Sequence, residues 1–342
     1  MPRQRSSHPA AGVSAAPAGD GATGDADGDG YTWGERASLW FLNCIDKSVK
    51  FIEPLLIVLA IGLISLDVYT FFKFVIPEVT ERRGSAVTVL HSVWALWLLF
   101  NVFFNQFHCA FSSPGTTLEV HEQALQLAMT YDWRWCRKCN RGKPPLTHHC
   151  SICNKCVLKM DHHCVWMANC IGFFNYRHFV LFLFWMWVGS LYSALVYLCE
   201  YPLLFKLESR EWDRRGFLPF FMFILSASIW LGISALFWWH VWLILTGQGT
   251  IDYLDNTQKV ADAKAHGRQW VNPYHLGAIA NWQETFDVRG RWWWLAWMLP
   301  TRRRKLGNGY VLPQIDLSIL DKAESASGHQ TQRGAGGSSN YV

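Results

Sequence analysis

The sequence is poor in charge and has no apolar run near its start. Charged residues make up 17% of the 342 residues, whereas 51% are hydrophobic, which is too apolar for an ordinary soluble domain. Residues 1–30 lack the apolar core of a secretory signal peptide. Because residues 1–35 and most of 307–342 have too little apolar surface to offset chain entropy, we expect both tails to be disordered.

Cysteine is scarce outside one short segment. Seven of the ten cysteines lie in residues 136–170, together with four histidines. A disulfide framework is typical of small secreted domains and would spread its cysteines more widely. Clustering with histidines in a large chain therefore favours metal binding.

Four stretches are long enough to cross a bilayer, which takes about 20 residues. They are roughly residues 51–72, 86–107, 179–201 and 217–246. The second and fourth have no formal charge. Asp67 in the first is costly in lipid, so it should face protein or lie near an interface. The sequence predicts an all-α integral membrane protein with four transmembrane helices.

The distribution of positive charge predicts the orientation. The loops 73–85 and 202–216 carry seven of the thirty-one lysines and arginines, and the others lie in the two terminal segments and the central loop 108–178. By the positive-inside rule, both termini and the central loop should be cytosolic. The cysteine segment then lies in a reducing compartment between spans two and three, where its thiols stay available.

The spacing within the cysteine segment predicts zinc. Cysteines separated by two residues can reach a single Zn²⁺ at about 2.3 Å, and several such pairs occur in residues 136–170. Two tetrahedral sites need eight ligands, and the segment offers eleven. The spacing alone does not decide which three are spare. Iron–sulfur ligation is the alternative, which the histidines disfavour.

The run Asp161-His162-His163-Cys164 contains the parts of an activated thiol. They are a cysteine nucleophile, a histidine base and a carboxylate that orients the base. A free cysteine is only about 3% thiolate at pH 7, and an adjacent imidazolium raises that fraction. A purely structural zinc module has no need of these groups.

The full pattern Cx2Cx9HCx2Cx2Cx4DHHCx5C resembles, position for position, the signature of the DHHC-type protein S-acyltransferases, or palmitoyltransferases. The resemblance implies one zinc ion on Cys136, Cys139, His149 and Cys156. It implies a second on Cys150, Cys153, His163 and Cys170. Cys164 would then be the nucleophile, His162 its base and Asp161 the partner of His162. His148 is left unassigned.

Three further motifs are similar to those of the family. Pro114-Gly115 resembles an Asp-Pro-Gly turn in which Ser113 replaces the Asp. Gly249-Thr250-Ile251-Asp252 stands in place of Thr-Thr-x-Glu, where only Thr250 matches and Asp252 keeps the carboxylate. Asn272-Pro273-Tyr274 looks like the start of a C-terminal motif that packs near the active site.

The resemblance implies a protein S-palmitoyltransferase that forms an S-acyl intermediate on Cys164. Its cofactors would be two structural zinc ions, with palmitoyl-CoA or another long-chain fatty acyl-CoA as acyl donor. Its partners would be the lipid bilayer and membrane or cytosol-facing proteins with membrane-proximal cysteines, and no nucleic acid. The layout resembles an endoplasmic-reticulum subgroup, so we expect an endoplasmic reticulum or Golgi membrane. A RING-like scaffold, a pseudoenzyme of the same family and a transporter or channel are the alternatives.

These expectations divide the chain. Spans one and two occupy 51–107 and spans three and four 179–246, and the cytosolic zinc domain with the active site lies between them in 108–178. Residues 247–306 should hold the C-terminal motif and an interfacial aromatic segment. For that segment, 289–305, the alternative is a tail packed on the helices.

Two features of the sequence leave alternatives open. Gly189 and Ser190 in span three could leave room for an acyl chain or serve helix packing. Basic side chains of the zinc loop could contact CoA phosphates or form a positive face toward anionic lipid. They are Arg134, Arg137, Lys138, Arg141, Lys143, Lys155 and Lys159.

Overall fold

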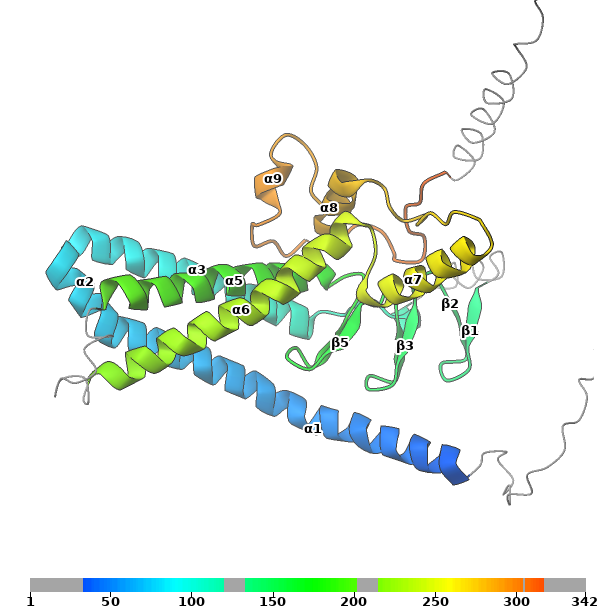
Figure 1. Ribbon diagram of the computed structural model, residues 1–342, viewed down its shortest axis with the longest axis horizontal. Coiled ribbons are helices and arrows are strands. Elements are labelled where there is room, and N and C mark those ends of the chain that lie inside the picture. Colours follow the sequence, from blue (N-terminus) through cyan, green and yellow to red (C-terminus); the bar gives the residue numbers. More distant parts are fainter. Residues whose placement is uncertain (1–32, 120–132, 202–214, 304, 317–342) are drawn as a thin grey trace, which may run out of the picture. The chain divides into compact units, whose positions relative to one another are not determined.

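The computed structural model describes residues 33–119, 133–201, 215–303 and 305–316 (Figure 1). The tails predicted to be disordered lie largely outside these ranges. The predicted disordered segment 1–35 extends slightly too far, because a helix already begins at Trp33. The contacts divide the chain into two units that meet between Asp46 and Lys47. Among the described residues, the first unit holds only the beginning of the first helix.

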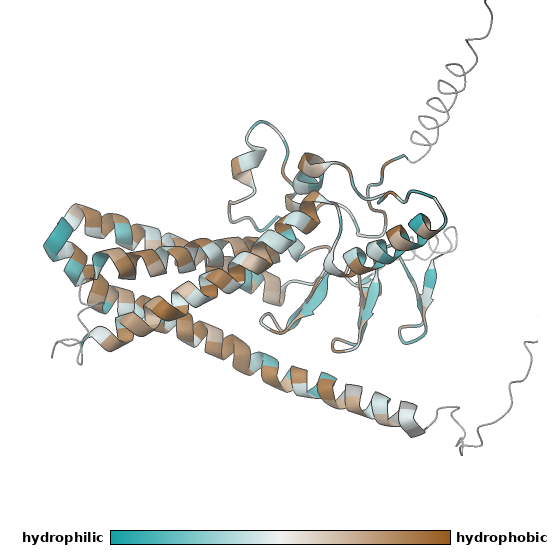
Figure 2. Ribbon diagram, in the orientation of Figure 1, coloured by the Kyte–Doolittle hydropathy of each residue, from teal (hydrophilic) through white to brown (hydrophobic). Residues whose placement is uncertain are grey.

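Within the residues that the structure describes, four helical segments are long and apolar enough to span a membrane, which is the predicted number. The first is Cys44–Arg83, which takes in most of α1 (Trp33–Thr70) and the helical turns that follow it. The others are α3 (Ser85–Phe111), α5 (Tyr176–Glu200) and α6 (Phe217–Leu245). Figure 2 shows that apolar residues predominate along α3, α5, α6 and the later part of α1, whereas the start of α1 is mixed. The cysteine-rich region lies between the second and the third of them, as predicted.

The segment 73–85, predicted to be a loop, is almost wholly helical. The first span continues from α1 through a π-helical turn, η1 (Phe71–Val75), into α2 (Ile76–Arg83). Only Gly84 separates α2 from α3, and its φ of +84° is a backbone angle that glycine adopts without steric cost. The prediction failed because the charges of this segment sit on a helix end.

Helix α5 is the centre of the bundle and packs against α3 on one side and α6 on the other (Figure 1). The core joins Val102 of α3, Leu183 of α5 and Phe237 of α6. A second cluster holds η1 and α2 against the far end of the bundle through buried side chains that include Val75 and Tyr197. These contacts fix the helices that surround the site described below.

The cysteine-rich region folds as three two-stranded hairpins in a row (Figure 1), which the all-α prediction did not include. They pair β1 (Arg134–Cys136) with β2 (Arg141–Lys143), β3 (His148–Cys150) with β4 (Lys155–Val157), and β5 (His162–Cys164) with β6 (Asn169–Ile171). Each turn uses one residue with positive φ, namely Asn140, Asn154 and Ala168. Asparagine tolerates this backbone conformation better than most residues.

The C-terminal segment contains α7 (Thr250–Ala265), α8 (Ala278–Phe286) and the short α9 (Trp293–Ala296). Beyond them the chain returns to the zinc region, where Tyr310 packs with Leu158 and donates a hydrogen bond to the carbonyl of Thr116 at 3.2 Å. This contact lies inside the predicted tail 307–342, so the first part of that tail is packed against the protein.

Part of the aromatic segment 289–305 packs on the helices, whereas its placement at a membrane interface stays a prediction. Trp292 and Trp294 are 61% and 52% exposed. Trp297 instead packs on the bundle, with its ring centroid 5.0 Å from that of Phe184.

Candidate active site and zinc centres

The first predicted ligand set comes together in space. The ligand atoms of Cys136, Cys139, His149 and Cys156 all lie within 4.8 Å of one another. The Nδ1 atom of His149 is 3.7, 3.2 and 3.8 Å from the three sulfur atoms. Tetrahedral Zn²⁺ with bonds of about 2.0–2.3 Å separates its ligand atoms by roughly 3.6 Å. The donor set therefore fits one zinc ion.

The second predicted set is equally compact. The ligand atoms of Cys150, Cys153, His163 and Cys170 also lie within 4.8 Å of one another. The Nδ1 atom of His163 is 3.7, 3.3 and 3.5 Å from the three sulfur atoms. Two Cys₃His clusters of this size are consistent with two zinc sites.

The strand register explains why the two sets interleave. His149 of β3 faces Cys156 of β4, and His163 of β5 faces Cys170 of β6. Each of these cross-strand pairs meets a pair of cysteines supplied by the preceding hairpin. The middle hairpin thus contributes to both sites, and two ions would join the three hairpins into one unit.

The alternation of side chains along β5 directs the adjacent residues His162 and His163 to opposite faces of the strand. Successive side chains of a strand point to opposite faces. His162 and Cys164 therefore share one face of β5, whereas His163 points to the other, toward its zinc set. The two four-ligand clusters leave Cys164 outside both.

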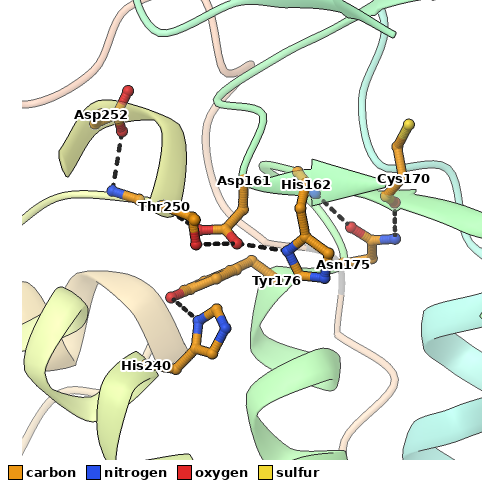
Figure 3. A network of polar contacts seen from close by, with 10 residues as sticks. Asp161, His162, Cys170, Asn175, Tyr176, His240, Thr250 and Asp252 are labelled. Carbon is orange, nitrogen blue, oxygen red and sulfur yellow. Dashed lines mark hydrogen bonds and ion pairs between the residues drawn. The ribbon is translucent and has the colours of Figure 1, made fainter. Parts of the chain in front are cut away.

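Asp161 orients His162 directly, since its carboxylate oxygen lies 2.6 Å from Nδ1 of the imidazole. Figure 3 shows the network around this pair. The backbone N–H and the hydroxyl of Thr250 each donate to the Asp161 carboxylate at 2.9 Å. Asp161 is only 2% exposed, so these donors offset the cost of burying its charge.

The divergent motif 249–252 keeps a clear structural role. Thr250 at the start of α7 supplies both donors to Asp161, while the Asp252 carboxylate accepts the N–H of Gly249 at 3.0 Å and caps the helix. A Cβ atom at Gly249 would lie 3.0 Å from an oxygen of Asp161 and 3.2 Å from one of Asp252. Because glycine has no Cβ, the carboxylates of Asp161 and Asp252 can both lie close to the backbone at position 249.

Two asparagines of the C-terminal segment hold the turn between α6 and α7 in place. The side chain of Asn272 donates to the carbonyls of Thr246 and Gly247 at 3.2 and 3.1 Å. That of Asn281 donates to the carbonyl of Leu245 at 3.0 Å. Both amides thus cap the end of α6, just before the turn that presents Thr250.

The electrostatics of the pair favour an ion pair. Burial would raise the pKa of Asp161, but the hydrogen bond from His162 and nearby positive charge hold it below its usual range. Burial would lower the pKa of His162, but its hydrogen bonds to Asp161 and Cys164 raise it to about 9. His162 is therefore cationic at neutral pH, and the Cys164 sulfur lies on the same side of β5.

His240 is a site residue that the sequence analysis missed. It lies on α6, is 2% exposed, and its Nδ1 is 3.1 Å from the hydroxyl of Tyr176. Its ring centroid lies 6.0 Å from that of His162 (Figure 3). An ionisable residue inside an apolar span is a signal that could have found it.

A cavity of about 710 Å³ opens beside Cys164 and His162. Helices α1, α3, α5 and α6 all contribute to its mainly apolar walls, which include Gly189 and Ser190. Along α5 the lining runs from Phe179 to Ser193, a rise of roughly 21 Å at 1.5 Å per residue.

Asp67 also lines this cavity and faces protein, as predicted. It accepts hydrogen bonds from the Ser193 hydroxyl at 2.9 Å and the Tyr197 hydroxyl at 3.1 Å. The cavity therefore extends from the thiol region to a half-buried carboxylate on α1.

Other predicted residues lie apart from this cavity. His148 is on the opposite face of β3 from His149 and stays without an assigned role. Arg141 donates to the carbonyl of Thr117 at 3.1 Å. Lys159 lines a small separate cavity with Lys305, and burial lowers the pKa of both amines, that of Lys305 to about 8.

Comparison with known proteins identifies similar chains. Residues 129–257 match the sequence model of a family described as DHHC palmitoyltransferase. Palmitoyltransferase ZDHHC16 of Mus musculus is 29% identical over 280 residues, which cover 78% of this chain and 75% of the relative. Probable protein S-acyltransferase 16 of Arabidopsis thaliana is 30% identical over 198 residues, covering 57% and 66%. Palmitoyltransferase ZDHHC20 of Homo sapiens is 33% identical over 180 residues, covering 53% and 46%.

Proposed function

Because the chain belongs to the DHHC palmitoyltransferase family and is a protein palmitoyltransferase, we propose that it transfers a long-chain acyl group from acyl-CoA to protein cysteines through a thioester on Cys164. One observation carries this proposal. Cys164 remains outside two complete four-ligand clusters and faces both His162 and a large apolar cavity. A purely structural zinc module accounts for the two clusters but not for the spare thiol beside His162 or for the cavity.

The first step forms the acyl-enzyme. The Cys164 sulfur attacks the thioester carbonyl carbon of acyl-CoA, a new carbon–sulfur bond forms, and the bond to the CoA sulfur breaks. Nδ1 of His162 is bound to Asp161, so the thiol proton resides on the Nε2 side and passes from there to the departing CoA thiolate. One thioester replaces another, so the step needs no separate energy source.

The second step reverses these roles. A substrate cysteine gives its proton to His162, its sulfur attacks the acyl carbon, and the Cys164 thiolate leaves. Acylation removes the interaction with Cys164 that helps to raise the pKa of His162. The imidazole thus becomes easier to deprotonate once the acyl-enzyme has formed, which prepares it to act as the base.

Asp161 acts by holding His162. Its two hydrogen bonds from Thr250 fix the carboxylate, and the carboxylate fixes the imidazole tautomer with Nδ1 protonated. Tyr176 and His240 are joined by a hydrogen bond, and the His240 ring lies beside that of His162. When bound, the two zinc ions would cross-link the hairpins, since four protein ligands leave no open coordination position.

The cavity suits the acyl chain. Burying about fifteen methylene groups at roughly 0.8 kcal/mol each gives an upper bound near 12 kcal/mol. The same chain also partitions into the surrounding lipid, so the net preference for the cavity is much smaller. Selectivity among chain lengths then depends on where the cavity ends.

We propose the same orientation that the charges predict, with both termini and the region 108–178 in the cytosol. Cys164 would then lie where the cytosol meets the bilayer, and its substrates would be proteins with cysteines close to the membrane. The functional segments follow the predicted division into 51–107, 108–178, 179–246 and 247–306. An endoplasmic reticulum or Golgi membrane is the proposed location.

The test is to incubate purified protein with alkyne-tagged palmitoyl-CoA beside Cys164→Ser and His162→Ala, and to measure zinc in all three. We expect a hydroxylamine-labile label on the wild type, none on Cys164→Ser, and about two zinc ions per chain throughout. Loss of zinc in Cys164→Ser would make that residue a ligand and overturn the assignment. Intact zinc without any labelling would favour a scaffold or pseudoenzyme.

A further inference from the structure

The two zinc centres differ in what supports their histidines. Nε2 of His149 is buried and has no hydrogen-bond partner among the described residues. Nε2 of His163 instead meets the carboxylate of Glu53, and both of these side chains are 7% exposed. A histidine that binds zinc through one nitrogen commonly donates its other N–H to a carboxylate, which fixes the ring and its tautomer. Only the second centre has such a partner among these residues.

Glu53 is an unusual residue for its place in the chain. On α1 it follows Ile52, which is 46% exposed, and precedes Pro54 and Leu55, of which Leu55 is 59% exposed. Glu53, taken as a whole residue, is only 6% exposed. A carboxylate at the start of an apolar span is costly unless it is paired. The His163 imidazole provides that pair across 110 positions of sequence.

We propose that Glu53 is a positioning residue that clasps the first transmembrane helix to the second zinc centre. Its carboxylate accepts the Nε2–H of His163 and so leaves Nδ1 free to face the three cysteine sulfurs. The same contact holds the zinc region against α1. This inference uses the zinc occupancy of the proposed function but does not depend on its acyl-transfer chemistry.

The clasp also bears on the cavity. Helix α1 supplies part of the cavity lining, including Ile64 and Asp67, and Cys164, the residue directly after His163, lines the same cavity. Little of the first span is buried, so few contacts hold it in place. Asp67 fastens it to α5 at one point, and Glu53 fastens it to the zinc region near the reactive thiol.

The experiment measures zinc release to a chromogenic chelator from purified Glu53→Leu, Glu53→Gln and wild-type protein. We expect Glu53→Leu to release one of the two zinc equivalents about 10- to 100-fold faster while the other keeps its wild-type rate. Glu53→Gln should be intermediate, because its amide oxygen still accepts the Nε2–H but carries no charge. Glu81→Leu, an exposed glutamate of the adjoining helix α2, is the control and should match the wild type.

Two outcomes would overturn the proposal. One is wild-type release of both ions from Glu53→Leu, and the other is equal acceleration of both, which general unfolding would cause. Repeating the assay in Cys164→Ser separates this proposal from the proposed function. The selective release should persist there, whether or not the enzyme forms a thioester.

A second readout tests the clasp itself. Amide hydrogen exchange of residues 51–64 should rise in Glu53→Leu and recover in Glu53→Gln. Unchanged exchange in Glu53→Leu would show that the contact does not hold α1.

Discussion

Filling the cavity at Gly189 should shorten the acyl chain that the enzyme accepts. Gly189 lines the cavity on α5, and a Cβ atom there would meet no other atom within 4 Å. The open space supports the role of leaving room for a chain over the role of close helix packing. A leucine at 189 would therefore project into the cavity without displacing a neighbouring helix.

The size of the effect follows from the helix geometry. Ser193 lies four residues beyond Gly189 in the cavity lining, so a block at Gly189 removes roughly 6 Å of depth at 1.5 Å per residue. An extended chain advances roughly 1.2 Å per bond, so the lost depth corresponds to about five methylene groups. At roughly 0.8 kcal/mol each, the loss is at most about 4 kcal/mol. Because lipid competes for the same chain, we expect a 10- to 100-fold change in selectivity.

The assay is self-acylation in the presence of competing palmitoyl-CoA, myristoyl-CoA and lauroyl-CoA. Gly189→Leu should favour lauroyl-CoA over palmitoyl-CoA relative to the wild type. The matched control is Gly62→Leu on α1, where a Cβ also meets no atom within 4 Å but the position lies outside the cavity lining. An unchanged chain-length profile in Gly189→Leu, with normal labelling, would refute the placement of the acyl chain in this cavity.

Further predictions concern the site and the zinc region. Asp161→Asn should lower the self-acylation rate about 10²- to 10⁴-fold with zinc content unchanged; a normal rate would contradict the orienting role. Thr250→Val should cost about 1 kcal/mol through the lost hydroxyl donor, visible as a lower melting temperature, whereas Thr250→Ser should behave as wild type. The pKa of His162 is raised from 6.5 to about 9, so its contribution to stability is complete below pH 6.5 and is lost as the pH rises through 9. The melting-temperature gap between wild type and His162→Ala should therefore narrow from pH 6.5 to 9.5; a widening gap would reverse the assigned charge. Chelation of zinc should expose residues 134–171 to protease while circular dichroism keeps most of its helical signal, and protection that survives chelation would contradict the structural role of the metal.

Local patterns in the sequence predicted much of this molecule. Four apolar runs predicted the four membrane-length helices, because length and hydropathy are properties of a continuous segment. Cysteine and histidine spacing predicted two zinc centres, because all the candidate ligands lie within one short segment, residues 136–170. The hairpins escaped prediction because strands of three residues leave almost no periodic signal. With the strand β5 known, alternation alone would have placed His162 and Cys164 on one face.

Contacts between distant residues were beyond such patterns. Thr250 and Asp161 are 89 positions apart, and Glu53 and His163 are 110 apart. Both pairs depend on how the membrane helices are placed around the zinc region, which no short window of sequence records. His240 could have been noticed as an ionisable residue inside an apolar span, but its position beside His162 is a contact of this distant kind.

The hairpins themselves explain why zinc would matter to a reaction that no zinc ion touches. Two-stranded sheets this short are at best marginally stable in water, and Cys164 and His162 both sit on such a strand, β5. The other face of that strand presents His163 to a ligand cluster. A metal bound there would hold the strand from one side while its opposite side offers the thiol to the cavity. Catalytic geometry must be kept within about 0.5 Å, a precision that a free hairpin of three-residue strands does not provide. Because the ligand His163 and the nucleophile Cys164 are adjacent residues, a rigid zinc centre would directly restrict the movement of the reacting sulfur.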